Sequence, residues 1–376
     1  MRLILVILLI LVLLTTGLAS ADVVDNVLNK AKEVGYSAGN SKVLVMTNLE
    51  YSSSSIKYMD EFIKKSKVLF SKNIIFVHSA YYKPLWFAFF NKTTGECIYI
   101  EIRNNSIYKI SKENINAENL FSNPKVWDKK MKKKIFDGNE FSIITIANVW
   151  AEGCPYELLK CAEFHNHICP GLISGYLIAE YLEKNLPLKK GEYYQILAIP
   201  PWCKDDAFQV LFDSTVGKRR MYVKQIDVNT LPKNLENIAG IYIAWNRSAG
   251  KGRAVLLAFN WSKACKMAGI NKSDFKRFSS YYWWYSRLKL DLFLIKHLSK
   301  PEIFVRSIKN FEINYTTLQE INTAGVNPLA KLGFINYKCT NNSKSALLVD
   351  YQLEIAAIVM ISLLIILIIF RFKNFK

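Results

Sequence analysis

Between two strongly apolar ends, the hydrophobic pattern of this chain alternates between helix-like and strand-like segments. In the first part, apolar residues at helical spacing predict helices, and short continuous apolar runs predict strands. The predicted helices are Val23–Val34 and Ile56–Lys65, and the predicted strands are Lys42–Thr47, Asn73–His78 and Ser106–Ile110. The runs Leu85–Phe90 and Cys97–Ile102, joined by a turn that contains Gly95, predict a β-hairpin. Residues 22–150 therefore predict a small α/β or α+β unit.

The pattern continues as a mixture of helices and strands after residue 150. The predicted helices are Tyr156–Phe164, Leu172–Lys184 and Asp206–Phe212, and the predicted strands are Tyr194–Ile199, Met221–Val228, Ile241–Trp245 and Ala254–Asn260. The aromatic and basic run Phe275–Leu298 predicts a helix that either caps the core or lies on a membrane surface. Residues 299–345 are polar and are expected to be irregular. The pattern therefore predicts a mixture of helices and strands over residues 151–275, followed by a membrane-proximal segment over residues 276–346.

The two ends of the chain have the features of targeting and membrane segments. A positive start, the apolar run Leu3–Leu14 and the small residues at 19–21 predict a cleavable signal peptide over residues 1–21. An uncleaved anchor is the alternative. Residues 347–370 are apolar enough to predict one transmembrane helix. The basic tail, residues 371–376, places the C-terminus in the cytoplasm, because positive charge favours that side. We therefore expect a single-pass protein of the cell membrane whose globular part is extracytoplasmic.

The chain is strongly basic, with a formal net charge of +19 at pH 7. In a cytosolic protein this charge would suggest nucleic acid as a partner. Export argues against nucleic acid and favours lipid headgroups or an acidic envelope polymer. Seven N-x-S/T sequons between the two predicted membrane-targeting ends agree with export. The densest basic cluster, Lys129–Lys134, is expected to be a solvated helix face.

The seven cysteines fall into two groups. One group lies in or near a histidine-rich segment and comprises Cys154, Cys161, Cys169 and Cys203. The other comprises Cys97, Cys265 and Cys339, which are the better candidates for a structural disulfide in an exported domain. The sequence does not decide which of them pair.

The histidine-rich segment is FHNHICPGLISGYL, residues 164–177. His165, His167 and Cys169 alternate along it, so on extended backbone all three side chains would point the same way. If the preceding helix runs through His165, Cys161 would join that face. Imidazole and thiolate together suit zinc or another borderline transition metal. This segment therefore predicts a metal site, and Pro170 and Gly171 after it allow the tight turn that opens the next helix.

A second polar group begins at Cys203, after the strand ending at Ile199. It comprises Cys203, Asp206 and Gln209, with Lys218 further on. Asp206 and Gln209 share one helix face because they are three residues apart. Ends of strands that feed helices are frequent binding positions.

These two segments resemble the signatures of the FmdE family, which takes its name from formylmethanofuran dehydrogenase. The family pattern is approximately F-H-x-H-x-C-P-G-L-x-x-G-Y, then C-x-x-D-A-x-Q, then G-C-T-x-G-K. Residues 164–176 and 203–218 follow it in order, and the likeness spans roughly residues 151–260. The cysteine of the last signature is missing, because Asp213-Ser214-Thr215 stands in its place. After residue 260 the chain also lacks the cysteine pairs that build a C-terminal zinc finger in some members.

The resemblance implies an α+β core, commonly an intertwined dimer, with a site lined by histidine and cysteine. We hypothesise a membrane-anchored, extracytoplasmic FmdE-like domain that binds a transition metal, zinc first. The metal ligands would be His165, His167, Cys169 and Cys203. If the domain is an enzyme, Asp206 is the candidate general base, Lys218 an anion clamp and Gln209 a third catalytic residue.

Two other functions remain open at this point. The fold could serve a non-catalytic binding or assembly protein, which the missing cysteine and the basic, aromatic surroundings favour. Alternatively, the chain could be an accessory component of formylmethanofuran dehydrogenase itself, an idea that rests on the family name alone.

Overall fold

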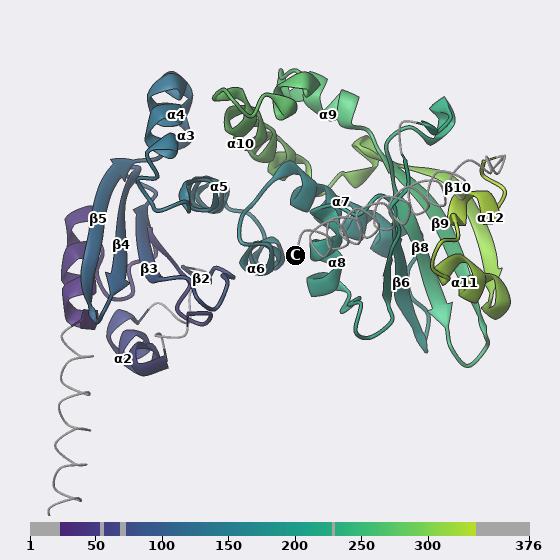
Figure 1. Ribbon diagram of the computed structural model, residues 1–376, viewed down its shortest axis with the longest axis horizontal. Helices are drawn as coiled ribbons and strands as arrows, with labels where there is room; N and C mark the ends of the chain where they lie inside the picture. The colour runs from purple at the N-terminus through teal and green to yellow at the C-terminus, as the bar shows by residue number, and fades with distance from the viewer. Residues whose placement is uncertain (1–22, 53–55, 68–72, 228–229, 336–376) are drawn as a thin grey trace, which may run out of the picture. The chain divides into compact units, whose positions relative to one another are not determined.

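The structure is a computed structural model that describes residues 23–52, 56–67, 73–227 and 230–335 (Figure 1). The predicted signal peptide, the predicted transmembrane helix and Cys339 lie outside these residues. Within the described residues, no helix combines the length and the apolar character that crossing a membrane requires. The chain divides into two compact units, residues 1–324 and 325–376. The described part of the second unit contains the short helix α12 (Pro328–Lys331), whose N-terminus the side chain of Asn327 caps.

The first sheet is mixed, with the strand order β2-β1-β3-β4-β5 (Figure 1). Its strands are β1 (Val43–Thr47), β2 (Ile74–Phe76), β3 (Leu85–Asn91), β4 (Glu96–Arg103) and β5 (Ser106–Asn114). The β1–β2 pair is parallel and the other pairs are antiparallel. The predicted hairpin is confirmed, since Phe90 of β3 is paired with Cys97 of β4. A mainly antiparallel sheet makes this part α+β rather than α/β.

Both faces of β1, β3 and β4 are buried, which explains why these strands read as continuous apolar runs, whereas the edge strand β5 is exposed or half-buried along its length. Successive side chains of a strand point to opposite faces. In β1, Leu44 and Met46 belong to one hydrophobic core, while Val43 and Val45 belong to another. The second core lies between the sheet and the N-terminal helical segment, residues 23–31, with η1 (Lys32–Val34) and α2 (Ile56–Ser66).

Three helices follow the first sheet: α3 (Ala117–Ser122), α4 (Pro124–Lys132) and α5 (Glu140–Ala151). The pattern of apolar residues did not predict α5, because nearly the whole helix is buried and no polar stripe marks a solvent face. Within α5, Asn148 donates from Nδ2 to the carbonyl of Ile115, 2.9 Å away. The lysine cluster forms the end of α4 and the turn after it, and its side chains are exposed or half-buried, as expected.

The second sheet is also mixed, with the order β10-β9-β8-β6-β7. Its strands are β6 (Glu192–Ala198), β7 (Met221–Val223), β8 (Ile238–Asn246), β9 (Lys251–Phe259) and β10 (Val305–Asn314). Only the β6–β7 pair is parallel among the pairs of this sheet. The expectation of an irregular segment over residues 299–345 was wrong at β10, which is an edge strand of the sheet. Its exposed, charged positions and a bulge near Ser307 obscure the alternation that predicts a strand.

The helices that follow α5 in the chain pack against the second sheet and against α5. They are α6 (Tyr156–His165), α7 (Pro170–Asn185), α8 (Lys204–Leu211), α9 (Trp261–Ala268), α10 (Tyr282–Leu294) and α11 (Tyr315–Asn322), with short turns η3 (Lys233–Leu235), η4 (Lys272–Lys276), η5 (Ile295–His297) and η6 (Pro301–Ile303). The aromatic helix α10 buries Trp284, Leu288 and Leu294 in the main core. It therefore caps the core, which was the first of its two predicted roles.

The structure also tests part of the expectation about disulfides. Cys97 of β4 and Cys265 of α9 are both buried and have free thiols, so the two do not form a disulfide with each other.

Candidate metal centre

The turn between α6 and α7 brings His165 and Cys169 together. Helix α6 runs through His165 and ends because Asn166 adopts a left-handed conformation, with φ 63°. The chain then extends to Cys169, whose φ of −148° and ψ of 163° are those of an N-cap residue. The Sγ atom of Cys169 accepts a hydrogen bond from the backbone N–H of Leu172, 3.4 Å away. Pro170 occupies the first turn of α7, where its missing N–H costs nothing.

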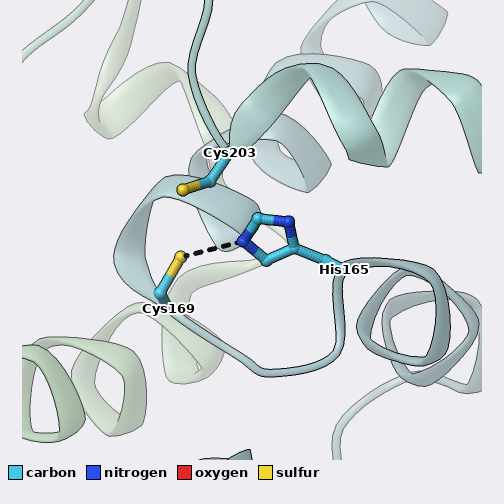
Figure 2. A group of neighbouring side chains, drawn as sticks. All are labelled: His165, Cys169 and Cys203. Atoms are coloured by element: carbon cyan, nitrogen blue, oxygen red, sulfur yellow. Dashed lines mark hydrogen bonds between the residues drawn. The ribbon is translucent and has the colours of Figure 1, made fainter. Parts of the chain in front are cut away.

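Three side chains converge at this turn, as Figure 2 shows: His165, Cys169 and Cys203. One imidazole nitrogen and the two Sγ atoms all lie within 4.8 Å of one another. The Nε2 atom of His165 is 3.7 Å from the Sγ of Cys169. The three residues come from the end of α6, the N-cap of α7 and the residue before α8. Two thiols and one imidazole are a donor set that zinc and related metals prefer.

Two glycines of α7 allow Cys203 to approach the other two residues. A Cβ atom on Gly171 would lie 2.9 Å from the Cβ of Cys203, and one on Gly175 would lie 2.3 Å from the carbonyl oxygen of Lys204. Any larger side chain at either position would push α7 and the start of α8 apart. Gly171 and Gly175 therefore explain how the histidine-rich segment comes close to the segment that begins at Cys203.

The backbone that carries Cys203 is fixed by the two residues that follow it. Lys204 and Asp205 form a buried ion pair, with Nζ 2.8 Å from Oδ1. Lys204 also donates to the carbonyl of Pro200, 2.9 Å away, and Asp205 accepts from the backbone N–H of Trp202, 2.7 Å away. Helix α8 begins at Lys204, two residues earlier than predicted, and Cys203 is its N-cap.

Asp206 and Gln209 form a chain of hydrogen bonds behind His165. The Nδ1 atom of His165 is 2.6 Å from Oδ2 of Asp206. Gln209 donates from Nε2 to the other carboxylate oxygen of Asp206, 3.1 Å away. A carboxylate on Nδ1 fixes the ring orientation and leaves Nε2 directed toward the two thiols. Asp206 and Gln209, three residues apart in α8, therefore hold His165 in place.

The electrostatics of the cluster favour a charged pair of thiolate and imidazolium. A hydrogen bond from Cys169 lowers the pKa of Cys203 to about 5, against the effect of burial and with help from His165. Burial lowers the pKa of His165, but hydrogen bonds to Asp206 and Cys203 outweigh it and raise that pKa to about 9. The pKa of Cys169 is raised well above its ordinary value, first by its hydrogen bond to Cys203 and then by burial. One thiolate is therefore available near neutral pH without a metal.

His167 lies beside the cluster and not within it. The centroid of its ring lies 4.3 Å from that of His165 and 5.2 Å from that of Phe141, and both pairs of rings are tilted to each other. Its Nδ1 is 2.8 Å from Oδ1 of Asn166. Burial is the main reason that its pKa falls to about 3, so the imidazole stays neutral. The backbone turns at Asn166, so strict alternation of side chains does not hold across the motif.

Two other residues named from the sequence also lie away from the cluster. Cys161 points elsewhere although α6 runs through His165: its thiol donates toward the carbonyl of Ala207, 3.9 Å away. Lys218 is exposed and forms an ion pair with Asp213.

The position of the missing family cysteine has a structural role in this chain. The hydroxyl of Ser214, which is fully buried, donates to the carbonyl of Tyr194, 3.1 Å away. The substitution therefore replaces a thiol with a group that ties the end of α8 to β6.

Helix α10 contributes two charged residues near the cluster that the sequence did not suggest. Arg287 and Asp291 are four residues apart and share one face of the helix. Burial lowers the pKa of Arg287, and both thiols of the cluster act against that effect. Burial raises the pKa of Asp291; the charge of Arg287 acts against that effect, and the charge of Cys203 adds to it. Asp291 is the only acidic residue of this apolar helix, and that was the signal available in the sequence.

Comparison with known families supports the relationship that the motifs indicate. A family model described as "FmdE, Molybdenum formylmethanofuran dehydrogenase operon" matches residues 164–281. The chain contains an FmdE domain. The match begins at the residue before His165, includes Cys203 and ends before α10. It covers less than a third of the chain. No curated protein shows significant similarity to this sequence.

Proposed function

We propose that the FmdE domain of this chain binds a transition metal, zinc first, through His165, Cys169 and Cys203. The observation that carries the proposal is the convergence of three donor atoms within 4.8 Å from three separate points of the chain. The carboxylate behind His165 also matches the usual support of a metal-bound histidine.

The donor set fits zinc better than a hard cation. Calcium and magnesium take oxygen ligands, whereas thiolates select soft or borderline metals. Three protein donors are also the number found in catalytic zinc sites, where the fourth position is open to substrate. A metal bound here would supply Lewis acidity to a group placed in that position.

The residues behind the donors have positioning roles in this proposal. Asp206 holds Nδ1 of His165, and Gln209 holds Asp206. This arrangement gives Asp206 a different task from the general base expected from the sequence, since its carboxylate is engaged on both oxygens. Lys218, paired with Asp213 on the surface, is not needed as an anion clamp. His167 remains a candidate fourth ligand that would have to turn away from Asn166.

For the location and partners of the chain we keep the proposals that the sequence supports. A signal peptide at residues 1–21 and one transmembrane helix at residues 347–370 would anchor the FmdE domain outside the cytoplasm. The basic surface would face anionic lipid headgroups or an acidic envelope polymer. A homodimer through the core is a further proposal, drawn from the family resemblance.

A non-catalytic binding or assembly protein is the second candidate function. Ser214 favours it, because the residue in place of the family cysteine is buried and bound to the backbone of β6. In that case the metal, if present, would stabilise the fold without acting on a substrate. An accessory component of formylmethanofuran dehydrogenase has no comparable observation in its favour.

The test of metal binding uses the full chain purified in detergent. Elemental analysis should find about one zinc or related ion per chain, and Cys169→Ala with Cys203→Ala should abolish it. Cys265→Ala is the matched control, since that thiol is buried in α9 and is not one of the three clustered donors. A protein purified without any transition metal, and unable to take one up, would refute the proposal.

A further inference from the structure

Helix α4 lies beside the segment that leads into α10 (Figure 1). Lys132 at the end of α4 donates from Nζ to the carbonyl of Ser279, 3.4 Å away, although 147 residues separate the two. The rings of Phe121 and Tyr285 also meet edge to face, with 4.9 Å between their centroids. Together, residues 125–134 and 276–282 form what we call the α4–α10 surface.

The α4–α10 surface carries a large excess of positive charge. Residues 125–134 and 276–282 contain eight lysines and arginines but only one acidic residue, Asp128. Lys132 already neutralises that carboxylate, because its Nζ lies 2.6 Å from Oδ2 of Asp128. Such a concentration of one sign of charge attracts anionic partners.

Three lysines of this surface are exposed in a stripe along α4 and its C-cap. Lys125, Lys129 and Lys133 follow one another at intervals of four residues, so they share one side of the helix. The ion pairs of the helix involve Lys130 and Lys132 instead. Like charges at this spacing destabilise a helix, so the stripe suits an external partner better than it suits the fold.

Aromatic side chains lie among these charges. Phe278 is 67% exposed, and the guanidinium of Arg287 lies 5.5 Å from the centre of its ring. The rings of Tyr281 and Tyr282 stack with 4.2 Å between their centroids, and the guanidinium of Arg277 lies 4.1 Å from the ring of Tyr282. Aromatic rings next to lysine and arginine suit a bilayer interface, because the rings enter the headgroup layer while the cations meet the phosphates.

We propose that the α4–α10 surface binds the headgroups of an anionic lipid bilayer. The stripe of lysines contacts the lipid phosphates, and Phe278 enters the headgroup layer. A soluble acidic polymer could use the charge, but it would not need the exposed apolar ring. This inference rests on the part of the proposed function that anchors the chain in a membrane. It adds the face of the protein that meets the lipid.

Hydrogen–deuterium exchange of the full chain in lipid nanodiscs tests the proposal. One set of discs contains phosphatidylcholine alone, and the other contains an equal part of anionic phosphatidylglycerol. Peptides from residues 125–134 and 276–282 should exchange severalfold more slowly in the anionic discs. Sodium chloride at about 1 M should remove the difference, because it shortens the screening length to about 3 Å. Strand β9, which is buried in the second sheet, should exchange equally in both discs.

Charge reversal of the stripe separates this surface from the net charge of the chain. The triple variant Lys125→Glu, Lys129→Glu and Lys133→Glu should lose the protection that anionic lipid gives. The matched control reverses three exposed lysines near the second sheet, and it should keep that protection: Lys190→Glu, Lys251→Glu and Lys309→Glu. The two triple variants have the same net charge, so an equal loss in both would overturn the proposal.

Phe278 provides an independent test of the aromatic contribution. Phe278→Ser should weaken the protection although every lysine remains, whereas Phe278→Trp should keep it. Equal exchange of the α4–α10 surface in the two kinds of disc would overturn the proposal. Protection by soluble polyglutamate but not by anionic lipid would also overturn it, in favour of an acidic polymer.

The membrane anchor is tested separately by whether the chain incorporates into discs at all. A chain that fails to incorporate would refute the anchor and leave the surface to be tested by sedimentation with phosphatidylglycerol vesicles. In that experiment the wild-type chain and the control triple variant should sediment, and the variant with the reversed stripe should not. A wild-type chain that stays in solution would overturn the lipid-binding surface as well.

Discussion

The Nδ1 atom of His165 and the Oδ2 atom of Asp206 lie 2.6 Å apart, although 41 residues separate them in the chain. This contact joins the two motifs of the sequence through an imidazole and the carboxylate that orients it. Gln209 supports this contact, because its side-chain amide donates a hydrogen bond to the other carboxylate oxygen of Asp206. The first testable consequences concern how firmly His165 is held.

Replacing Asp206 should weaken metal binding without destroying the donor set. Asp206→Asn keeps the size of the side chain but removes the charge that holds Nδ1 of His165, so zinc affinity should fall by about 10- to 100-fold. Chelator competition measures the change. Asp213→Asn is the control, because Asp213 is exposed and paired with Lys218 and Arg220, away from the cluster. Equal affinities for the two variants would contradict the positioning role of Asp206.

His165 and His167 should respond very differently to substitution. His165→Gln removes a donor atom of the cluster and should abolish zinc binding at micromolar metal. His167→Gln removes a ring that packs beside His165 and should lower affinity only moderately. Isothermal titration with zinc compares them. A complete loss of binding in His167→Gln would show instead that His167 is a ligand, as the sequence suggested.

The helix contact behind the site should be intolerant of one methyl group. Gly175→Ala would place a Cβ 2.3 Å from the carbonyl oxygen of Lys204. The free energy of unfolding should fall by about 1–3 kcal/mol, a typical cost of overpacking. Because the added methyl group would push α7 away from α8, it should weaken metal binding too. Gly217→Ala has nothing within 4 Å of the added methyl and should be near neutral. Denaturant unfolding decides, and similar stabilities for both variants would argue against the close contact.

The metal-free protein should contain a thiolate at unusually low pH. Because the pKa of Cys203 is lowered to about 5, its thiolate forms above that pH and persists through neutrality. The rate of Cys203 alkylation by iodoacetamide should therefore be near its maximum at about pH 6.5. An ordinary thiol, whose pKa is about 8.5, reaches its maximum rate only above that pH. Rates followed by peptide mass spectrometry test this.

Two variants sharpen the experiment on Cys203. Cys169→Ala removes the hydrogen bond that is the largest cause of the lowered pKa of Cys203, so the midpoint of alkylation should move to higher pH. His165→Ala should move it in the same direction, because the hydrogen bond and charge of His165 also lower that pKa. A wild-type midpoint near that of a free thiol would rule out the charged pair.

Local sequence patterns predicted much of the fold and part of the site. The hairpin of β3 and β4 was predictable because turn and strand signals lie side by side. His165 and Cys169 were predictable for the same reason, since one short motif contains both. The link to Cys203 depended on resemblance to a family, because nothing in local spacing brings such distant parts of the chain together. Gly171 and Gly175 make that link, but a contact between helices cannot be read from either motif alone.

The errors of the sequence analysis have physical causes. Helix α5 was missed because burial on nearly all sides removes the polar stripe that marks a helix. Strand β10 was missed because an edge strand with exposed charges looks like a loop. His167 lies next to His165, with 4.3 Å between their ring centroids, and its role as a metal ligand stays a prediction.

The central claim is that His165, Cys169 and Cys203 hold one transition metal. X-ray absorption at the zinc edge of the purified, zinc-loaded chain tests it most directly. We expect two sulfur neighbours at about 2.3 Å and a histidine nitrogen at about 2.0–2.1 Å. The Cys203→Ala variant, if it retains zinc, should show one sulfur fewer. A first shell made only of oxygen and nitrogen would contradict the claim.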